Sequence, residues 1–260
     1  MKSLILILGI LTGLEVQAEI LELRFHGGAI RSYVDDRLTL KDDGTAELKT
    51  LSPFPYSLDQ NVVGIFSKKL DVPTSQKLRD ESSKLFGVKA SKPLRAGNSI
   101  LGEISIVGAQ DKKGFVWSLE SEPLARNLET LFYELKAKIL EQPKAALTLR
   151  CKRSAKLVQC LLKNIGSEIV HTVDPMGVTE SIFCVDQDGR RGVMNPGEEV
   201  DPRKMSPKHL QLKKDEEFLF SIDDHASCHT RILVKTSDLL VNANYKNALL
   251  GELVSNKLEK

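Results

Sequence analysis

Several segments between residues 20 and 120 alternate apolar and polar positions, which predicts β-strands. The alternation is clear in ILELRF (20–25) and YVDDRLTLK (33–41), and again in SILGEISIVG (99–108) and GFVWSLE (114–120). A side-chain period of two is typical of strands with one buried face. Asp43-Gly44 is a strong turn signal and leads into a further alternating stretch, TAELKTL.

Two segments instead repeat their apolar residues with a helical period. The first, VPTSQKLRDESSKLF, has Pro73 near its start and Leu78 and Leu85 seven residues apart. The second, EPLARNLETLFYELKAKILEQ, has Pro123 in its first turn, a leucine face, and Pro143 just beyond its end. Proline is favoured in the first turn of a helix and stops one that precedes it, so both segments predict helices.

These elements contain a candidate internal repeat, in which four residues recur fifty positions later. The matching pairs are Gly64 and Gly114, Pro73 and Pro123, Leu78 and Leu128, and Leu85 and Leu135. This repeat predicts two strand–strand–helix units that form one α+β domain over residues 19–142, with both helices on one sheet face. The alternative is coincidence among common residues.

From residue 144 the helical period disappears and short strand candidates follow one another about every ten residues. They include KAALTLRC, LVQCLLKN, SIFCVDQ, FLFSID and RILVKT, separated by stretches rich in Gly, Pro, Asn and Asp. This rhythm predicts an antiparallel β-sandwich over residues 143–250, with 251–260 as a C-terminal tail. The rhythm resembles that of exported immunoglobulin-type domains, which implies an immunoglobulin-like sandwich, although the only tryptophan, Trp117, lies in the other half.

The N-terminus, MKSLILILGILTGLEVQAE, has the layout of a secretory signal peptide over residues 1–18. Lys2 supplies the basic start, an apolar run follows, and Val16-Gln17-Ala18 precedes the mature start at Glu19. The rival interpretation is a membrane anchor, but the eleven residues from Leu4 to Leu14 are too short for a hydrocarbon core of ~30 Å. We therefore expect a bacterial exported protein, periplasmic or secreted, without a membrane span.

The four cysteines of such a protein are expected to form disulfides, because thiols outside the cytosol are oxidised. In a hairpin of residues 147–154 and 157–164, Cys151 lies directly opposite Cys160, close to bridging distance. Cys184 would then pair with Cys228. The alternative is a bridge from Cys160 to Cys228 that ties two sheets together, as in immunoglobulin domains.

Charge and motifs exclude several classes of function. The net charge of +2 gives no global attraction to nucleic acid. The chain has His-Gly-Gly at residues 26–28 but no Gly-x-Ser-x-Gly elbow, and it contains no phosphate-binding or dinucleotide-binding glycine motif. No cofactor is therefore expected, and a non-enzymatic protein is favoured over an enzyme.

One polar cluster offers an alternative. In DDHASCHT, the residues Asp223, His225 and His229 stand close together beside Asp224 and Cys228. Carboxylate, imidazole and thiolate groups are the ligands that zinc takes in proteins. The alternative function is accordingly an exported metal-dependent hydrolase that uses the Asp223–His229 cluster. The purely structural explanation of the same residues is a polar turn between strands.

The favoured function is an exported binding protein built on a disulfide-stabilised β-sandwich. Its partner would be an unknown protein or a component of the cell envelope. The long segment 186–206 is the loop we expect to make contact, with Arg190, Arg191 and Arg203 as charged anchors, because arginine is over-represented at the energetic centres of interfaces.

Overall fold

The structure is a computed structural model, and every structural statement below refers to the residues that it describes. These are residues 20–27, 34–50, 62–86, 100–107, 112–118, 125–154, 156–178, 181–186, 191–194, 208–224, 231–236, 247–249 and 251–258. The signal peptide predicted for residues 1–18 lies outside them.

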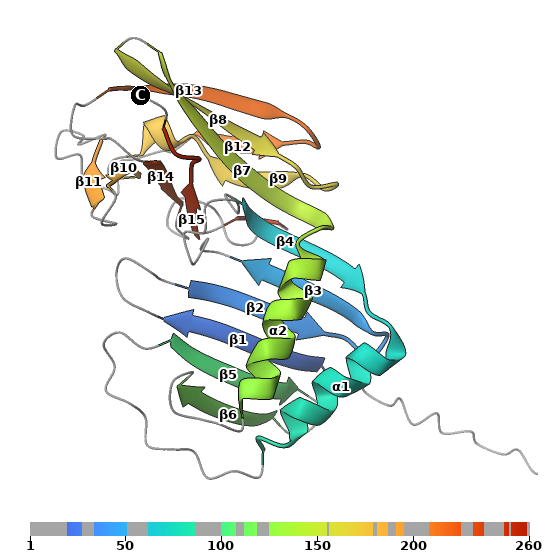
Figure 1. Ribbon diagram of the computed structural model, residues 1–260. Coiled ribbons are helices and arrows are strands. Elements are labelled where there is room, and N and C mark those ends of the chain that lie inside the picture. Colours follow the sequence, from blue (N-terminus) through green and yellow to red (C-terminus); the bar gives the residue numbers. More distant parts are fainter. Residues whose placement is uncertain are drawn as a thin grey trace, which may run out of the picture.

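Most of the described chain is antiparallel β-sheet, and nine strands form one long sheet (Figure 1). Their order is β13-β8-β7-β4-β3-β2-β1-β5-β6. The strands are β1 (Ile20–Gly27), β2 (Val34–Leu40), β3 (Thr45–Thr50), β4 (Val62–Lys69), β5 (Ile100–Val107), β6 (Lys112–Ser118), β7 (Pro143–Ser154), β8 (Leu157–Asn164) and β13 (Glu217–Asp223). The strands predicted from alternation in the first half are present, with ends shifted by one or two residues.

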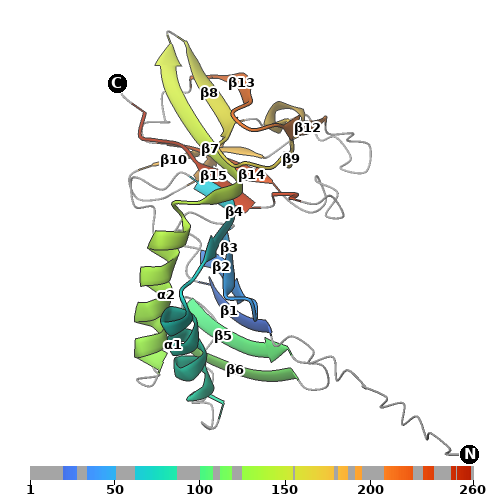
Figure 2. The same cartoon turned by 90° about the vertical axis from the view of Figure 1, so that its right-hand side faces the viewer.

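Both described helices, α1 (Val72–Ser83) and α2 (Arg126–Ile139), lie on the same face of this sheet (Figure 2). The Asp71 side chain caps α1 by accepting a hydrogen bond from the Thr74 amide at 2.7 Å. The leucines that carried the helical period are buried in one apolar core together with alternate residues of the strands, among them Leu23, Leu38 and Leu48. Both predicted helices are present, α1 with Pro73 in its first turn, while α2 begins at Arg126 and Pro123 lies outside the described residues.

The offset-fifty pairs occupy comparable places where both members are described. Leu78 and Leu128 are buried in the same core, and so are Leu85 and Leu135. Gly64 and Gly114 lie inside β4 and β6 and do not open them, and Pro123 lies outside the described residues. The duplication remains a prediction.

A second β layer packs against the β7–β8–β13 part of the long sheet. It consists of a four-stranded sheet of order β11-β10-β14-β15 and a β9–β12 pair. The bounds are β9 (Val170–Val173), β10 (Ile182–Val185), β11 (Arg191–Val193), β12 (His209–Leu212), β14 (Arg231–Thr236) and β15 (Gly251–Val254). Buried residues of both layers, such as Leu149, Leu162 and Ile232, form one apolar core between them. This arrangement is a sandwich of β layers.

The disulfide predicted from hairpin geometry is present. Cys151 and Cys160 face each other in the β7–β8 register and are bonded, with their Cα atoms 4.1 Å apart. This excludes the alternative bridge from Cys160 to Cys228. Cys184 is also disulfide-bonded, while Cys228, its predicted partner, lies outside the described residues.

Two segments differ from expectation. Residues 251–260 were predicted to be a tail, but Gly251–Val254 form β15, and Leu253 of this strand belongs to the sandwich core. Asn256 then exchanges hydrogen bonds of 2.8 and 3.0 Å with the backbone of Cys151. Segment 186–206 was predicted to be a loop, and it contains the short strand β11.

The predicted boundary near residue 143 does not separate the sheets. Strand β4, from the first half, pairs antiparallel with β7, from the second, and the register shifts between Ile65 and Phe66. A Cβ atom at Gly64 would lie 2.4 Å from the Ala145 carbonyl oxygen, so glycine permits this close approach. Of the described helices, neither α1 nor α2 is long and apolar enough to cross a bilayer.

A second glycine makes room for the single tryptophan. Trp117 on β6 is buried and donates its indole N–H to Glu129 of α2 at 2.8 Å. Gly102 faces it on β5, and a Cβ atom there would lie 2.3 Å from the indole ring. The indole therefore lies over the backbone of the neighbouring strand.

We expect Gly102→Ala to lower the free energy of unfolding by about 1–3 kcal/mol, because the added methyl overpacks the core against the indole. Urea unfolding followed by Trp117 fluorescence measures this. The matched control is Gly192→Ala on β11, where a Cβ atom meets nothing within 4 Å and the change should stay within about 0.5 kcal/mol. Equal effects of the two substitutions would contradict the packing argument.

Candidate functional site

One face of the long sheet carries no described helix and presents polar side chains over four strands, with an apolar residue on a fifth. We call it the helix-free face. It is formed by Glu22, Arg24 and His26 of β1, Asp35, Arg37 and Thr39 of β2, Glu47 and Lys49 of β3, Glu103 and Ser105 of β5, and Val116 of β6. These residues alternate with those buried under the helices, since successive strand side chains point to opposite faces.

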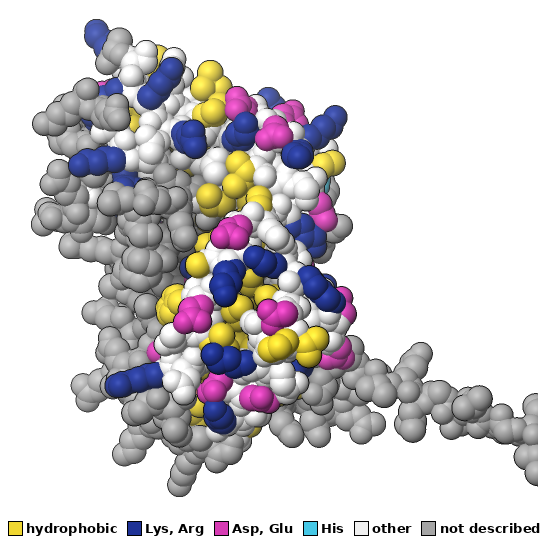
Figure 3. All heavy atoms as spheres, turned by 45° about the vertical axis from the view of Figure 1, so that its right-hand side comes forward, with side chains coloured by type: hydrophobic (Ala, Val, Ile, Leu, Met, Phe, Trp, Pro, Cys, Tyr) yellow, Lys and Arg dark blue, Asp and Glu magenta, His cyan; other side chains and the backbone are white. Residues whose placement is uncertain are grey.

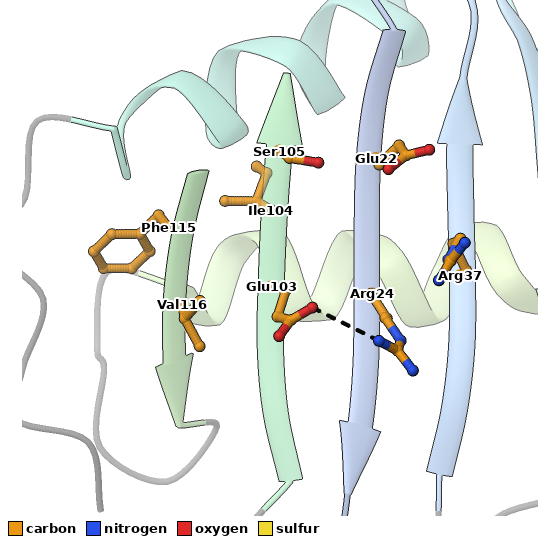
Figure 4. Close-up of a pocket in the computed structure, with 8 residues that line it drawn as sticks. All are labelled: Glu22, Arg24, Arg37, Glu103, Ile104, Ser105, Phe115 and Val116. Carbon is orange, nitrogen blue, oxygen red and sulfur yellow. Dashed lines mark ion pairs between the residues drawn. The ribbon is translucent and has the colours of Figure 1, made fainter. Parts of the chain in front are cut away.

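A hollow of about 470 Å³ lies on this face (Figure 4). Its lining consists of Glu22, Arg24, Arg37, Glu103, Ile104, Ser105, Phe115 and Val116. The polar members come from three neighbouring strands, and Figure 4 shows their side chains above the sheet with α2 on the far side. The hollow therefore has a charged floor and an apolar border at β6.

An ion-pair network holds one end of the floor. The Arg24 guanidinium donates to both carboxylate oxygens of Asp35, at 3.1 and 3.4 Å. It also lies 4.0 Å from Glu103, as the dashed line in Figure 4 marks. The His26 Nε2 atom is 3.0 Å from the same Glu103 carboxylate. Residues of β1, β2 and β5 thus fix one another's orientation.

Arg37 forms the other end of the floor, and Lys49 of β3 lies directly opposite Arg37, just outside the hollow. Neither makes an ion pair within the described part of the chain. Burial lowers the pKa of Lys49 below its ordinary value, and the Arg37 charge lowers that pKa further, while Asp35 and Glu47 raise it. Like charges in directly opposed positions are unfavourable, so Arg37 and Lys49 repel each other at this point of the face.

The arrangement is suited to recognition. The described residues include no group of three or more metal-ligating side chains. The helix-free face contains no cysteine, and its one histidine contacts a carboxylate. A network of oriented charges beside a hollow can bind polar groups of a ligand through charge-assisted hydrogen bonds.

The residues predicted to bind a partner are placed differently. Arg191 lies on β11 and makes a bidentate ion pair with Glu252 of β15, at 2.7 and 2.9 Å. It joins the two edge strands of the four-stranded sheet, and its role as a partner-binding residue stays a prediction. Arg190 and Arg203 lie outside the described residues.

The residues predicted to bind a metal are only partly described. Asp223 ends β13 and is exposed, and the neighbouring Asp224 accepts a hydrogen bond of 2.9 Å from Arg153. His225, Cys228 and His229 lie outside the described residues. The Asp223–His229 cluster therefore remains a prediction.

The fold does bring together two histidines that are 38 residues apart in the sequence. His171 of β9 and His209 of β12 are stacked, with Nδ1 and Nε2 3.1 Å apart. Burial and the neighbouring His209 lower the pKa of His171. No sequence pattern indicates this pair, because it depends on the pairing of two strands separated by a long segment.

The charged residues of the helix-free face were also missed as a site. Their signal was present in ILELRF and YVDDRLTLK, where alternation places Glu22, Arg24 and Arg37 away from the core. Strand order, which makes β1 the neighbour of both β2 and β5, was not readable from the pattern. Only that order assembles the network.

Charges of both signs are interspersed on the surface seen in Figure 3, without a broad field of one sign. This agrees with the near-balanced net charge of +2. No protein-family model matches this chain, and no curated protein is similar to it in sequence.

We expect Arg191 and Glu252 to be coupled in stability. Arg191→Gln, Glu252→Gln and the double variant form a double-mutant cycle, and we expect a coupling free energy of about 1–2 kcal/mol, because bidentate pairs are stronger than single ion pairs. Chemical denaturation of the four proteins measures it. A coupling near zero would show that Arg191 is available for another role.

We expect Lys49→Met to stabilise the protein at neutral pH by a few tenths to about 1 kcal/mol, because it removes one of two opposed cations. With the folded pKa of Lys49 below the ordinary 10.5, the unfolded chain binds more protons between the two values. Stability of the unmodified protein therefore rises with pH through that window.

The advantage of Lys49→Met should accordingly shrink as the pH approaches 10.5. Urea unfolding at several pH values between 7 and 10 measures the difference, with Lys77→Met on the exposed side of α1 as the control. A difference that is independent of pH would contradict the depressed pKa of Lys49.

Proposed function

We propose that this chain is an exported, non-enzymatic binding protein that recognises a protein partner through the helix-free face. The observation that supports this proposal is the combination of a charged floor and a hollow of about 470 Å³ on the sheet face without a described helix. Ligand sites are concave and carry a few well-placed polar groups. A partner protein that lays a segment along this face would fill the hollow.

The surroundings of the face favour recognition by a rigid surface. Helices α1 and α2 pack under it, and the Cys151–Cys160 bridge reinforces the β7–β8 hairpin of the same long sheet. A surface that is ordered before binding loses little conformational entropy when a partner binds. The interspersed charges disfavour nucleic acid, which requires a continuous basic surface.

Export is supported by the N-terminal pattern and by the disulfide, since disulfides persist in oxidising compartments. We therefore propose a periplasmic or secreted protein of a bacterium, with a mature start at Glu19 and with a protein or another envelope component as partner.

We also propose that residues 19–142 form an α+β domain and residues 143–250 an immunoglobulin-like sandwich. The separate apolar cores support this division: one contains both helices, and the other lies between β layers. The shared β4–β7 pairing would make the two domains one mechanical unit.

We expect Ser105→Arg to reduce partner capture at least about tenfold, because a long cationic side chain would occupy the hollow. The mature protein from Glu19, with its N-terminus checked by intact mass, is cross-linked in the exported fraction, and captured proteins are quantified by mass spectrometry. Ser83→Arg adds the same side chain at the exposed end of α1 and should leave capture unchanged.

Two results would overturn the proposal. Equal capture by Ser105→Arg and the unmodified protein would show that the helix-free face is not the interface. Capture no greater than that of an unrelated exported protein would contradict a binding function altogether.

A further inference from the structure

We infer that Arg37 and Lys49 together bind a carboxylate group, supplied by an acidic side chain in an extended segment of the partner protein. This inference rests on the proposed function and specifies the chemistry that the helix-free face recognises. It assigns the anchoring position to the two cations that the described residues leave without an ion pair.

The positions of the two cations define the site. They are opposed across β2 and β3, so their side chains leave the same sheet face from neighbouring strands. Cβ atoms of such pairs are ~4.5–5.5 Å apart, a spacing that one carboxylate can bridge. The planar Arg37 guanidinium can bind both oxygens, while the Lys49 ammonium acts as a point charge.

Two described carboxylates beside the cations, those of Asp35 and Glu47, are already engaged. Asp35 accepts two hydrogen bonds from Arg24, and Glu47 accepts one from Lys144 at 3.2 Å. Glu22 lies one row further along, opposite Thr39 and Ser105. An external carboxylate is therefore the partner that would relieve the repulsion between the two cations.

The position of Lys49 strengthens the case. Its neighbour on β4 is Ile65, which packs against the sandwich core. Lys49 thus lies where the helix-free face meets the second β layer and is partly buried, whereas Arg37 is exposed. A charge-assisted hydrogen bond gains strength in such partly desolvated surroundings.

The surroundings also select the class of ligand. Glu22, Asp35 and Glu47 lie near the two cations on the same face, and Glu103 lies beyond Arg24, the residue opposite Arg37 on β1. A polyanion such as nucleic acid or an anionic membrane would be repelled by them, because like charges in close contact are unfavourable. A single carboxylate between neutral or basic residues fits, and an extended peptide presents side chains in this manner.

The test uses capped pentapeptides that differ only in the central residue, which is glutamate, glutamine or phosphoserine. Each is titrated into isotopically labelled mature protein, and the Arg37 and Lys49 amide signals and the Arg37 guanidinium signals are followed by NMR. We expect saturable shifts at both residues with the glutamate peptide and shifts at least about tenfold weaker with glutamine.

Variants locate the effect. Arg37→Gln with Lys49→Gln should weaken glutamate-peptide binding at least about tenfold. The charge-matched control, Lys77→Gln with Lys138→Gln, removes two exposed cations from the helices and should leave binding unchanged. Because the Arg37 and Lys49 replacements relieve repulsion, the double variant should remain folded, as its far-ultraviolet circular dichroism can verify.

Three results would overturn the inference: unsaturable shifts, equal binding of the glutamate and glutamine peptides, or binding that survives in the Arg37 and Lys49 variant. Phosphoserine binding about tenfold tighter than glutamate binding would replace the carboxylate class with a phosphate. If the peptide test fails while Ser105→Arg still abolishes partner capture, the carboxylate site is wrong and the binding face stands.

Discussion

The structure depends on the pairing of β4 with β7. On one side of this pair the helices cover one face of the long sheet, and on the other side the second β layer covers the opposite face. In the order of the sheet, the helices cover one face from β6 to β4, and the second β layer covers the other face from β4 to β13. Both coverings meet at this pair, so consecutive residues Ala145, Ala146 and Leu147 are all buried. Small side chains and Gly64 are required there because two layers and a neighbouring backbone converge.

This change of face explains why the helix-free face exists. The helices pack only on the other side of β1, β2, β3 and β5, and the second β layer begins at β4. Alternate side chains of those strands are left to interact with one another or with a ligand. Arg24 pairs with Asp35 and Glu103, and His26 lies beside Glu103, whereas Arg37 and Lys49 make no ion pair with any described residue. The candidate binding site thus exists because no described layer covers this face and because two of its cations have no ion-pair partner among the described residues.

Two buried charged side chains between the sheet and α2 also pair with each other. Lys136 of α2 and Asp36 of β2 are both buried and make an ion pair, with Nζ and Oδ2 2.6 Å apart. Removing one partner of such a pair is costly, since it leaves an isolated buried charge. The pair ties α2 to β2, whose next residue is Arg37. The floor of the proposed site is thereby connected to the helical layer that supports it.

The sequence by itself determined the elements and one covalent link. Alternation and helical period located the strands and both helices, and the register of the predicted hairpin placed Cys151 opposite Cys160. These features were predictable because they depend on residues close together in the chain. Strand order was decided only by the tertiary structure. It joined β4 to β7 across a predicted boundary, drew Gly251–Val254 into the sandwich, paired Arg191 with Glu252 and assembled the helix-free face. Contacts between distant segments depend on how whole layers pack, and a local pattern carries no record of which strand becomes a neighbour.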